Sequence, residues 1–251
     1  MTASANTILV TGASSGIGAA VCRRVASSGT NIVVHGRKIS NLEALAANLT
    51  ERGAAVEIIA SDLAEEGAAE QLVSRAVARF GRLDQIVSNA GFADSAPLGV
   101  VGRDVLDRSY DAMAGAFFEL ATAGLDPLRR SECGRVVAIS SFVAHRFASD
   151  CLFPATAAAK SSLEAIAKSL AVQLGPAGVA VNCVAPGYTR KDPGAHRAIS
   201  PELLAQMAGK AATGRISEPD DVAAVVQFLL SRDARQITGQ VINVDGGLNI
   251  C

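Results

Sequence analysis

Short apolar runs rich in β-branched residues alternate along this chain with longer segments whose apolar residues recur every three to four positions. The short runs predict strands at residues 7–10, 31–35, 56–60, 85–88, 135–139, 179–183 and 240–244. The longer segments predict helices at residues 16–28, 40–51, 64–80, 103–130, 157–174 and 219–231. Because the strands are apolar throughout and alternate with helices, they predict a parallel sheet covered on both faces.

This alternation predicts a Rossmann-like α/β fold: a doubly wound, seven-stranded parallel sheet flanked by helices in three layers. No repeat, low-complexity segment or linker interrupts it, so residues 1–251 are expected to form a single domain. The least regular stretch is 188–215, which contains Asp192-Pro193-Gly194 and several charges. Because open α/β sheets bind ligands beyond the carboxyl ends of their strands, this stretch predicts a substrate lid, with an ordinary solvated loop as the alternative.

The composition narrows the class of protein. Hydrophobic residues make up 49% of the chain and charged residues 19%, which favours a large buried core. The net charge of −1 gives no general attraction for nucleic acid or anionic membranes. The five cysteines are scattered, without a C-x-x-C pair, and indicate neither a disulfide framework nor a metal site. With no signal-peptide pattern and no apolar run of bilayer length, we expect a cytoplasmic protein that acts on a small-molecule substrate, with no nucleic-acid or membrane partner.

The segment from Thr11 to Gly18, T-G-A-S-S-G-I-G, joins the first predicted strand to the first predicted helix. Glycines allow a tight turn and a close approach of the backbone to a pyrophosphate, and the helix N-terminus attracts an anion. The segment therefore predicts a phosphate cradle for a dinucleotide. Its candidate contacts are Gly12, Ser14, Ser15, Gly16, Ile17 and Gly18.

With this motif in place, the chain resembles the short-chain dehydrogenase/reductase family over nearly its whole length. The matching motifs are T-G-x-x-x-G-x-G, Asp62-Leu63, Asn89-Ala90-Gly91, Pro186-Gly187 and the tail from Gly214 to Gly247. The resemblance implies that Asp62 and Leu63 contact adenine, and that Asn89, Ala90 and Gly91 lie beside the cofactor. It also implies that Pro186, Gly187 and Thr189 border the nicotinamide. Family members commonly form tetramers, so a homo-oligomer, tetramer or dimer, is expected.

The end of the second predicted strand indicates which dinucleotide binds. NAD-specific sites place an acidic residue there, whereas this strand ends in His35-Gly36-Arg37-Lys38. Arg37 can bind a ribose 2′-phosphate through charge-assisted hydrogen bonds, and Lys38 adds a second positive charge. The alternative is that both residues only begin a solvated helix. We therefore expect the cofactor to be NADP(H).

The catalytic pattern departs from the family. The resemblance assigns the ribose-binding lysine to Lys160 and the carbonyl-holding serine to Ser141, but Thr156 stands four residues before Lys160, where the family has a tyrosine. The asparagine of the family pattern corresponds to Met113, or to Ala112 in the adjacent register. A phenol titrates near ~10, and an aliphatic hydroxyl is a much weaker acid. Thr156 is thus expected to be a weak or altered participant in proton transfer.

Three functions remain open. The first is an NADP(H)-dependent oxidoreductase that transfers hydride to a small carbonyl or activated alkene, with His145, or less favourably Tyr188, supplying the proton. The second is a reductase of conjugated double bonds, because dienoyl-CoA reductases of the same superfamily carry a small hydroxyl residue at the tyrosine position; Arg190, Lys191 and Arg197 would then meet an anionic substrate. The third is a relative that binds NADP(H) without redox turnover, or with a non-redox reaction.

Overall fold

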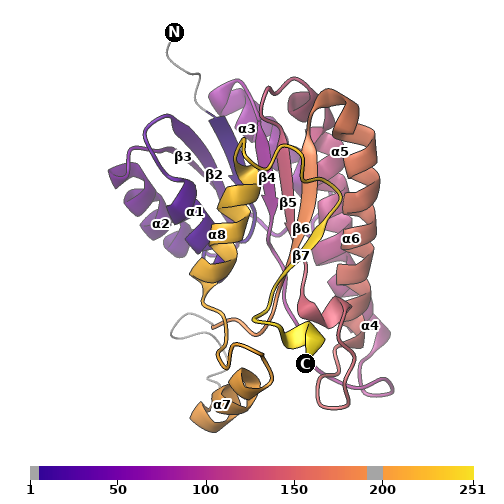
Figure 1. The fold of residues 1–251 in the computed structure, drawn as a ribbon. Coiled ribbons are helices and arrows are strands. Elements are labelled where there is room, and N and C mark those ends of the chain that lie inside the picture. Colours follow the sequence, from indigo (N-terminus) through magenta and orange to yellow (C-terminus); the bar gives the residue numbers. More distant parts are fainter. Residues whose placement is uncertain (1–5, 191–199) are drawn as a thin grey trace.

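Seven parallel strands form one sheet in the order β3-β2-β1-β4-β5-β6-β7 (Figure 1). This computed structural model describes residues 6–190 and 200–251. The strands are β1 (Asn6–Val10), β2 (Thr30–Gly36), β3 (Ala55–Ala60), β4 (Gln85–Ser88), β5 (Arg135–Ile139), β6 (Ala180–Pro186) and β7 (Val241–Val244). The predicted doubly wound α/β fold is thereby confirmed.

The strand order reverses between β1 and β4, which pair directly. Leu9 of β1 lies opposite Val33 of β2 on one side and Ile86 of β4 on the other. In sheets of this kind, ligands bind beyond the carboxyl ends of the strands at the point of reversal. The loops after β1 and β4 therefore define the expected position of a cofactor.

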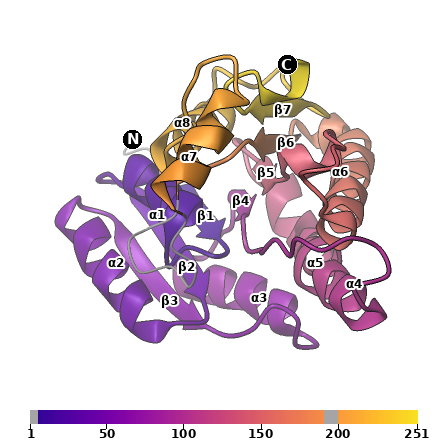
Figure 2. The same ribbon diagram turned by 90° about the horizontal axis from the view of Figure 1, so that it is seen from below.

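Helices cover both faces of the sheet (Figures 1 and 2). One apolar core lies between the sheet and α3, α5 and α6, and a second lies between the sheet and α1, α2 and α8. The helices are α1 (Gly16–Val25), α2 (Ile39–Glu51), α3 (Ala68–Phe80), α4 (Arg103–Ser109), α5 (Ala116–Arg129), α6 (Pro154–Leu174), α7 (Pro201–Gly209) and α8 (Pro219–Leu230). In the described part of the chain, no helix combines the length and the apolar character that crossing a bilayer requires.

Two segments differ from the prediction. Residues 103–130 do not form one continuous α-helix, because a π-helical segment η1 (Tyr110–Gly115) separates α4 from α5. Within 188–215, where no helix was predicted, Ser200 caps α7 by accepting a hydrogen bond from the backbone N–H of Leu203. Side-chain periodicity does not reveal a π-turn, and α7 has no buried residue that would have marked it.

Candidate active site

The loop after β1 packs tightly against the loop after β4. Gly12 has φ +63°, and a Cβ at this position would lie 2.8 Å from Asn89 Nδ2 and 2.9 Å from Ala90 Cα. At Gly18, a Cβ would lie 2.3 Å from the carbonyl oxygen of Gly12. Only glycine fits at these two positions without displacing backbone.

Asn89 ties these loops together through hydrogen bonds. Its Nδ2 donates to the carbonyl oxygens of Thr11 and Gly12, both at 3.0 Å. The Thr11 hydroxyl in turn accepts from the backbone N–H groups of Asn89 and Ala90. The Asn89-Ala90-Gly91 segment thus fixes the glycine-rich turn from the side of β4.

The beginning of α1 offers the surroundings that a phosphate needs. Ser15 is the N-cap residue and makes no side-chain cap hydrogen bond, so its hydroxyl is not committed to the helix end. Gly16 has φ +54°, and a Cβ built on it would meet no atom of the described residues within 4 Å. Ile17 follows in the first turn, and the helix dipole favours an anion at this N-terminus.

Beyond this turn, the end of β2 lies beside the end of β3. A Cβ on Gly36 would lie 3.2 Å from Ser14 Oγ, which places Ser14 against the β2 end. Arg37 Nη1 lies 3.9 Å from Asp62 Oδ2, and the Arg37 side chain is 76% exposed. Lys38 is the N-cap residue of α2, and Leu63 is buried. The structure therefore brings the residues assigned to the adenosine end into one region.

The residues assigned to the nicotinamide lie after β6. A Cβ on Gly187 would lie 2.7 Å from Asp245 Cα, so the chain passes closely under the segment after β7. The Thr189 hydroxyl donates to the carbonyl oxygen of Gly187 at 3.1 Å. Pro186, at the end of β6, is buried.

Lys160 lies on α6 with its ammonium group next to the end of β5. Its Nζ donates to the carbonyl oxygen of Ile139 at 2.6 Å, two residues before Ser141. A Cβ on Gly91 would lie 3.3 Å from both Lys160 Nζ and Met113 Sδ. The π-helical segment therefore presents Met113, rather than Ala112, to this position. Burial lowers the pKa of Lys160 to about 8.

Thr156 lies one turn before Lys160 on α6 but faces different groups. Its side chain is 1% exposed, and its Oγ1 accepts a hydrogen bond from the backbone N–H of Asp94 at 3.3 Å. The segment after β4 thus covers the Thr156 hydroxyl. Ser141 Oγ accepts a long hydrogen bond from the Val143 N–H at 3.4 Å.

A buried carboxylate that the sequence analysis did not single out lies one turn after Lys160. Glu164 is 5% exposed, and its Oε1 accepts a short hydrogen bond from Ser140 Oγ. The same oxygen lies 2.8 Å from His145 Nε2. His145 is therefore connected to the Ser140–Ser141 segment through Glu164. The one available signal in the sequence was the position of Glu164 on the apolar face of this helix.

Tyr188 packs inside a small apolar cluster. Its ring lies 4.7 Å from that of Phe142, and its hydroxyl donates to Cys151 Sγ at 3.7 Å. Burial and the contact with Cys151 raise the pKa of this phenol.

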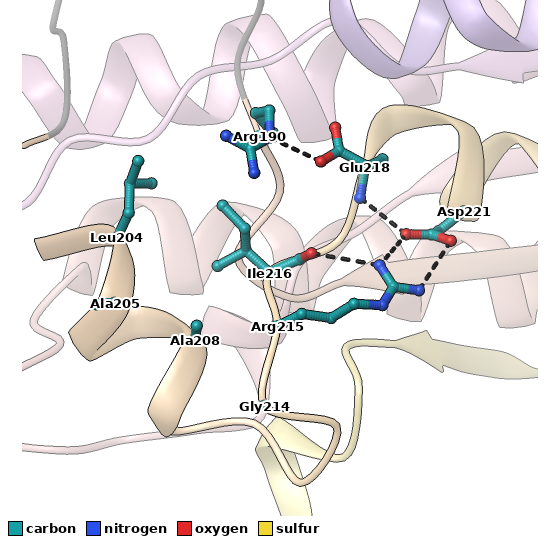
Figure 3. A pocket seen from close by; sticks show the side chains of 9 residues that line it. All are labelled: Arg190, Leu204, Ala205, Ala208, Gly214, Arg215, Ile216, Glu218 and Asp221. Carbon is teal, nitrogen blue, oxygen red and sulfur yellow. Dashed lines mark hydrogen bonds and ion pairs between the residues drawn. The ribbon is translucent and has the colours of Figure 1, made fainter. Parts of the chain in front are cut away.

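A cavity of about 530 Å³ lies between α7 and the beginning of α8 (Figure 3). Arg190 Nε contacts Glu218 Oε1 at 2.7 Å, and Arg215 contacts both carboxylate oxygens of Asp221. The rest of the lining is largely apolar and comprises Leu204, Ala205, Ala208, Gly214 and Ile216. Neither Ser141 nor Lys160 lines this cavity. Lys191 and Arg197, which were considered for an anionic substrate, lie outside the described residues.

Known proteins resemble this chain over almost its whole length. The family model described as enoyl-(acyl carrier protein) reductase matches residues 12–249. An uncharacterized oxidoreductase from Methylorubrum extorquens is 35% identical and covers 96% of both chains. The 3-oxoacyl-[acyl-carrier-protein] reductase of Aggregatibacter actinomycetemcomitans is 32% identical over 96% of this chain and 98% of its own length.

The structural similarity is equally extensive. A short-chain dehydrogenase from Burkholderia cenocepacia, solved in complex with NADP, superimposes with a TM-score of 0.90 at 32% identity and covers 98% of each chain. With the glycine-rich turn, the sheet order and these relatives in agreement, the chain belongs to the short-chain dehydrogenase/reductase family of oxidoreductases.

Proposed function

We propose that this protein is an NADP(H)-dependent oxidoreductase that transfers hydride to a small carbonyl or activated alkene substrate. The observation that carries the cofactor choice is Arg37, a largely exposed cation directly after β2 where an NAD site has an acid. Such a guanidinium can bind a 2′-phosphate with charge-assisted hydrogen bonds. The NADP complex of the Burkholderia relative supports the same choice.

The residues present fit a dinucleotide. Gly12 and Gly18 keep side chains out of the turn after β1, and α1 begins with its positive end directly after this turn. Ser14, Ser15 and Ile17 would bind the pyrophosphate, while Asp62 and Leu63 would border the adenine. When bound, NADPH supplies the hydride.

The reacting end of the site would be formed by Ser141 and Lys160. Ser141 Oγ would donate a hydrogen bond to the substrate oxygen and hold it in place. Lys160 would bind the nicotinamide ribose, beside Asn89, Ala90 and Gly91. Thr156 stands where the family has its tyrosine, and its buried hydroxyl makes it a weak participant at most.

Two further features belong to this proposal. The stretch 188–215, with α7 and the cavity beside it, would act as a substrate lid on a single domain of residues 1–251. The chain would assemble as a homotetramer or homodimer, as family members commonly do.

Calorimetry and absorbance spectroscopy together test the function. We expect the purified protein to bind NADPH more tightly than NADH. We also expect a loss of absorbance at 340 nm with NADPH and at least one member of a panel of ketones, aldehydes and enoyl thioesters. Failure to bind either nucleotide would refute the whole proposal.

The second candidate is an NADP(H)-binding relative without redox turnover. The burial of Thr156 beneath Asp94 favours it, because no hydroxyl is presented at the position of the usual proton donor. Tight NADPH binding without substrate-dependent oxidation across the same panel would select this candidate.

A further inference from the structure

A carbonyl that receives hydride needs a proton on its oxygen, and the family's phenol is missing here. Thr156 is poorly placed to supply it, because its hydroxyl lies under the segment after β4, where its oxygen accepts the N–H of Asp94. An aliphatic hydroxyl is in any case poorly matched to proton transfer near neutral pH.

The two other candidate donors are held by other groups. The ring of His145 contacts the buried carboxylate of Glu164 at 2.8 Å. The hydroxyl of Tyr188 points to Cys151 within an apolar cluster, where burial raises the pKa of the phenol. The His145 ring and the Tyr188 hydroxyl are therefore directed at partners within the protein rather than at a substrate oxygen.

Among the candidates in the described part of the chain, Lys160 remains, and its position is suitable. Its hydrogen bond to the carbonyl of Ile139 anchors it to the same strand end that carries Ser141. Within the described residues, this carbonyl is the one hydrogen-bond acceptor that Lys160 Nζ contacts, so two of its N–H groups can serve a ligand. A Cβ on the exposed Gly91 would lie 3.3 Å from Nζ and 3.3 Å from Met113 Sδ, and neither Gly91 nor Met113 has a side-chain proton to give.

We propose that Lys160 itself donates the proton to the substrate oxygen that Ser141 holds, in place of the absent phenol. The proposal rests on the proposed hydride transfer from NADPH. The substrate oxygen gains one proton from Nζ, the electrons of that N–H bond stay on nitrogen, and Lys160 becomes a neutral amine. Water returns the proton after the product leaves.

The electrostatic surroundings suit this role. Burial lowers the pKa of Lys160 to about 8, while the Glu164 carboxylate on the same helix favours its protonated form. Burial raises the pKa of the Cys183 thiol to about 12, so this group is uncharged near neutrality. Among the other groups near α6, the His145 ring contacts Glu164 and the Arg108 guanidinium of α4 contacts Asp94, so neither side chain is directed at Nζ. A pKa of about 8 leaves roughly nine-tenths of Lys160 protonated at pH 7, which suits a general acid.

The decisive variant is Lys160→Arg, which keeps a cation and N–H donors but does not release a proton in this pH range. Its control is Lys168→Arg, an exposed position on the same helix. With NADPH and ethyl acetoacetate as the carbonyl probe, we expect kcat to fall roughly 10²–10⁴-fold in Lys160→Arg. NADPH affinity should change less than about threefold, and the loss of native kcat above pH 8 should disappear. Unchanged kcat, or parallel losses in kcat and NADPH affinity, would overturn the donor role.

A second measurement needs neither substrate nor cofactor. In protein labelled with [ε-¹³C]lysine, one resonance should titrate near pH 8 and be missing from Lys160→Arg. Titration of that resonance above pH 10 would also overturn the assignment. NADPH binding without reduction of any carbonyl probe by the native protein would instead refute the proposed function, and the donor role with it.

Discussion

Replacing Arg37 with alanine should weaken NADPH binding selectively. In the structure, the Arg37 side chain is 76% exposed, and its charged partner within the described residues is Asp62, at 3.9 Å. An exposed pair of this kind is worth at most about 1 kcal/mol, whereas hydrogen bonds to a charged group contribute about 1.5–3 kcal/mol. If Arg37 gives up Asp62 for a 2′-phosphate, the net gain is about 1–2 kcal/mol. Arg37→Ala should therefore raise the Kd for NADPH about 5–30-fold.

Calorimetric titration with both nucleotides makes the test specific. The Kd for NADH should stay within about threefold of the native value, because NADH has no 2′-phosphate for Arg37 to bind. Arg52→Ala serves as the control, since Arg52 is an exposed arginine at the far end of α2. Raising the salt concentration should narrow the difference between native protein and Arg37→Ala, because salt screens exposed charges. Equal weakening of NADPH and NADH would refute the assignment of Arg37 to the 2′-phosphate.

Three further predictions concern the turn after β1 and the stability of the fold. Gly18→Ala should lower NADPH affinity at least about tenfold in calorimetry and destabilise the protein by about 1–3 kcal/mol in thermal melts, because the new Cβ would clash with the Gly12 carbonyl oxygen. The control Gly175→Ala, whose Cβ would meet no atom of the described residues within 4 Å, should change neither NADPH affinity nor stability. Burial lowers the pKa of His35, so this histidine takes up its proton at a higher pH in the unfolded chain than in the folded protein, and the free energy of unfolding should decrease below about pH 6.5. Urea titrations at pH 5–8 measure this decrease, and an equal decrease in the His35→Gln variant would contradict the prediction. Burial alone would raise the pKa of Asp84, but hydrogen bonds from Arg82, Ser131 and the Thr7 N–H lower it. Asp84→Asn should therefore cost on the order of 3 kcal/mol in urea unfolding at pH 7, and this cost should shrink as the pH falls below 3.8, the ordinary pKa of the group.

The fold and the cofactor end could be predicted because their signals are local. The strands are largely apolar, with single polar residues such as Glu57 in β3 and Asn182 in β6, because helices cover both faces of the sheet. The predicted strand positions agree with the structure within a few residues. The requirements at Gly12 and Gly18 come from backbone contacts within one turn and the neighbouring strand end, and glycine is the residue that meets them. Most residues of this part of the site are therefore close together in the sequence, so a short motif is sufficient to predict them.

The catalytic end could not be predicted as fully, because its geometry depends on contacts between distant segments. The π-helical segment that directs Met113 to Lys160 has no periodic signature in the sequence. Glu164 is acidic and sits on a helix, so periodicity alone does not tell that it is buried against Ser140 and His145. These contacts join β5, η2 (Phe142–Ala144) and α6, which are separated along the chain.

Thr156 and Lys160 show how far spacing can be used. Residues four apart on a helix share a face, so the sequence predicts that Thr156 and Lys160 lie on the same side of their helix. Spacing does not say which partner each side chain meets: the Thr156 hydroxyl is covered by the Asp94 N–H, whereas the Lys160 ammonium reaches Ile139 and Gly91. The short threonine side chain ends at the segment after β4, whereas the longer lysine side chain extends to the end of β5. In the proposed mechanism, the lysine therefore supplies, among the described residues, the reach and the acidity for proton transfer that a threonine at position 156 lacks.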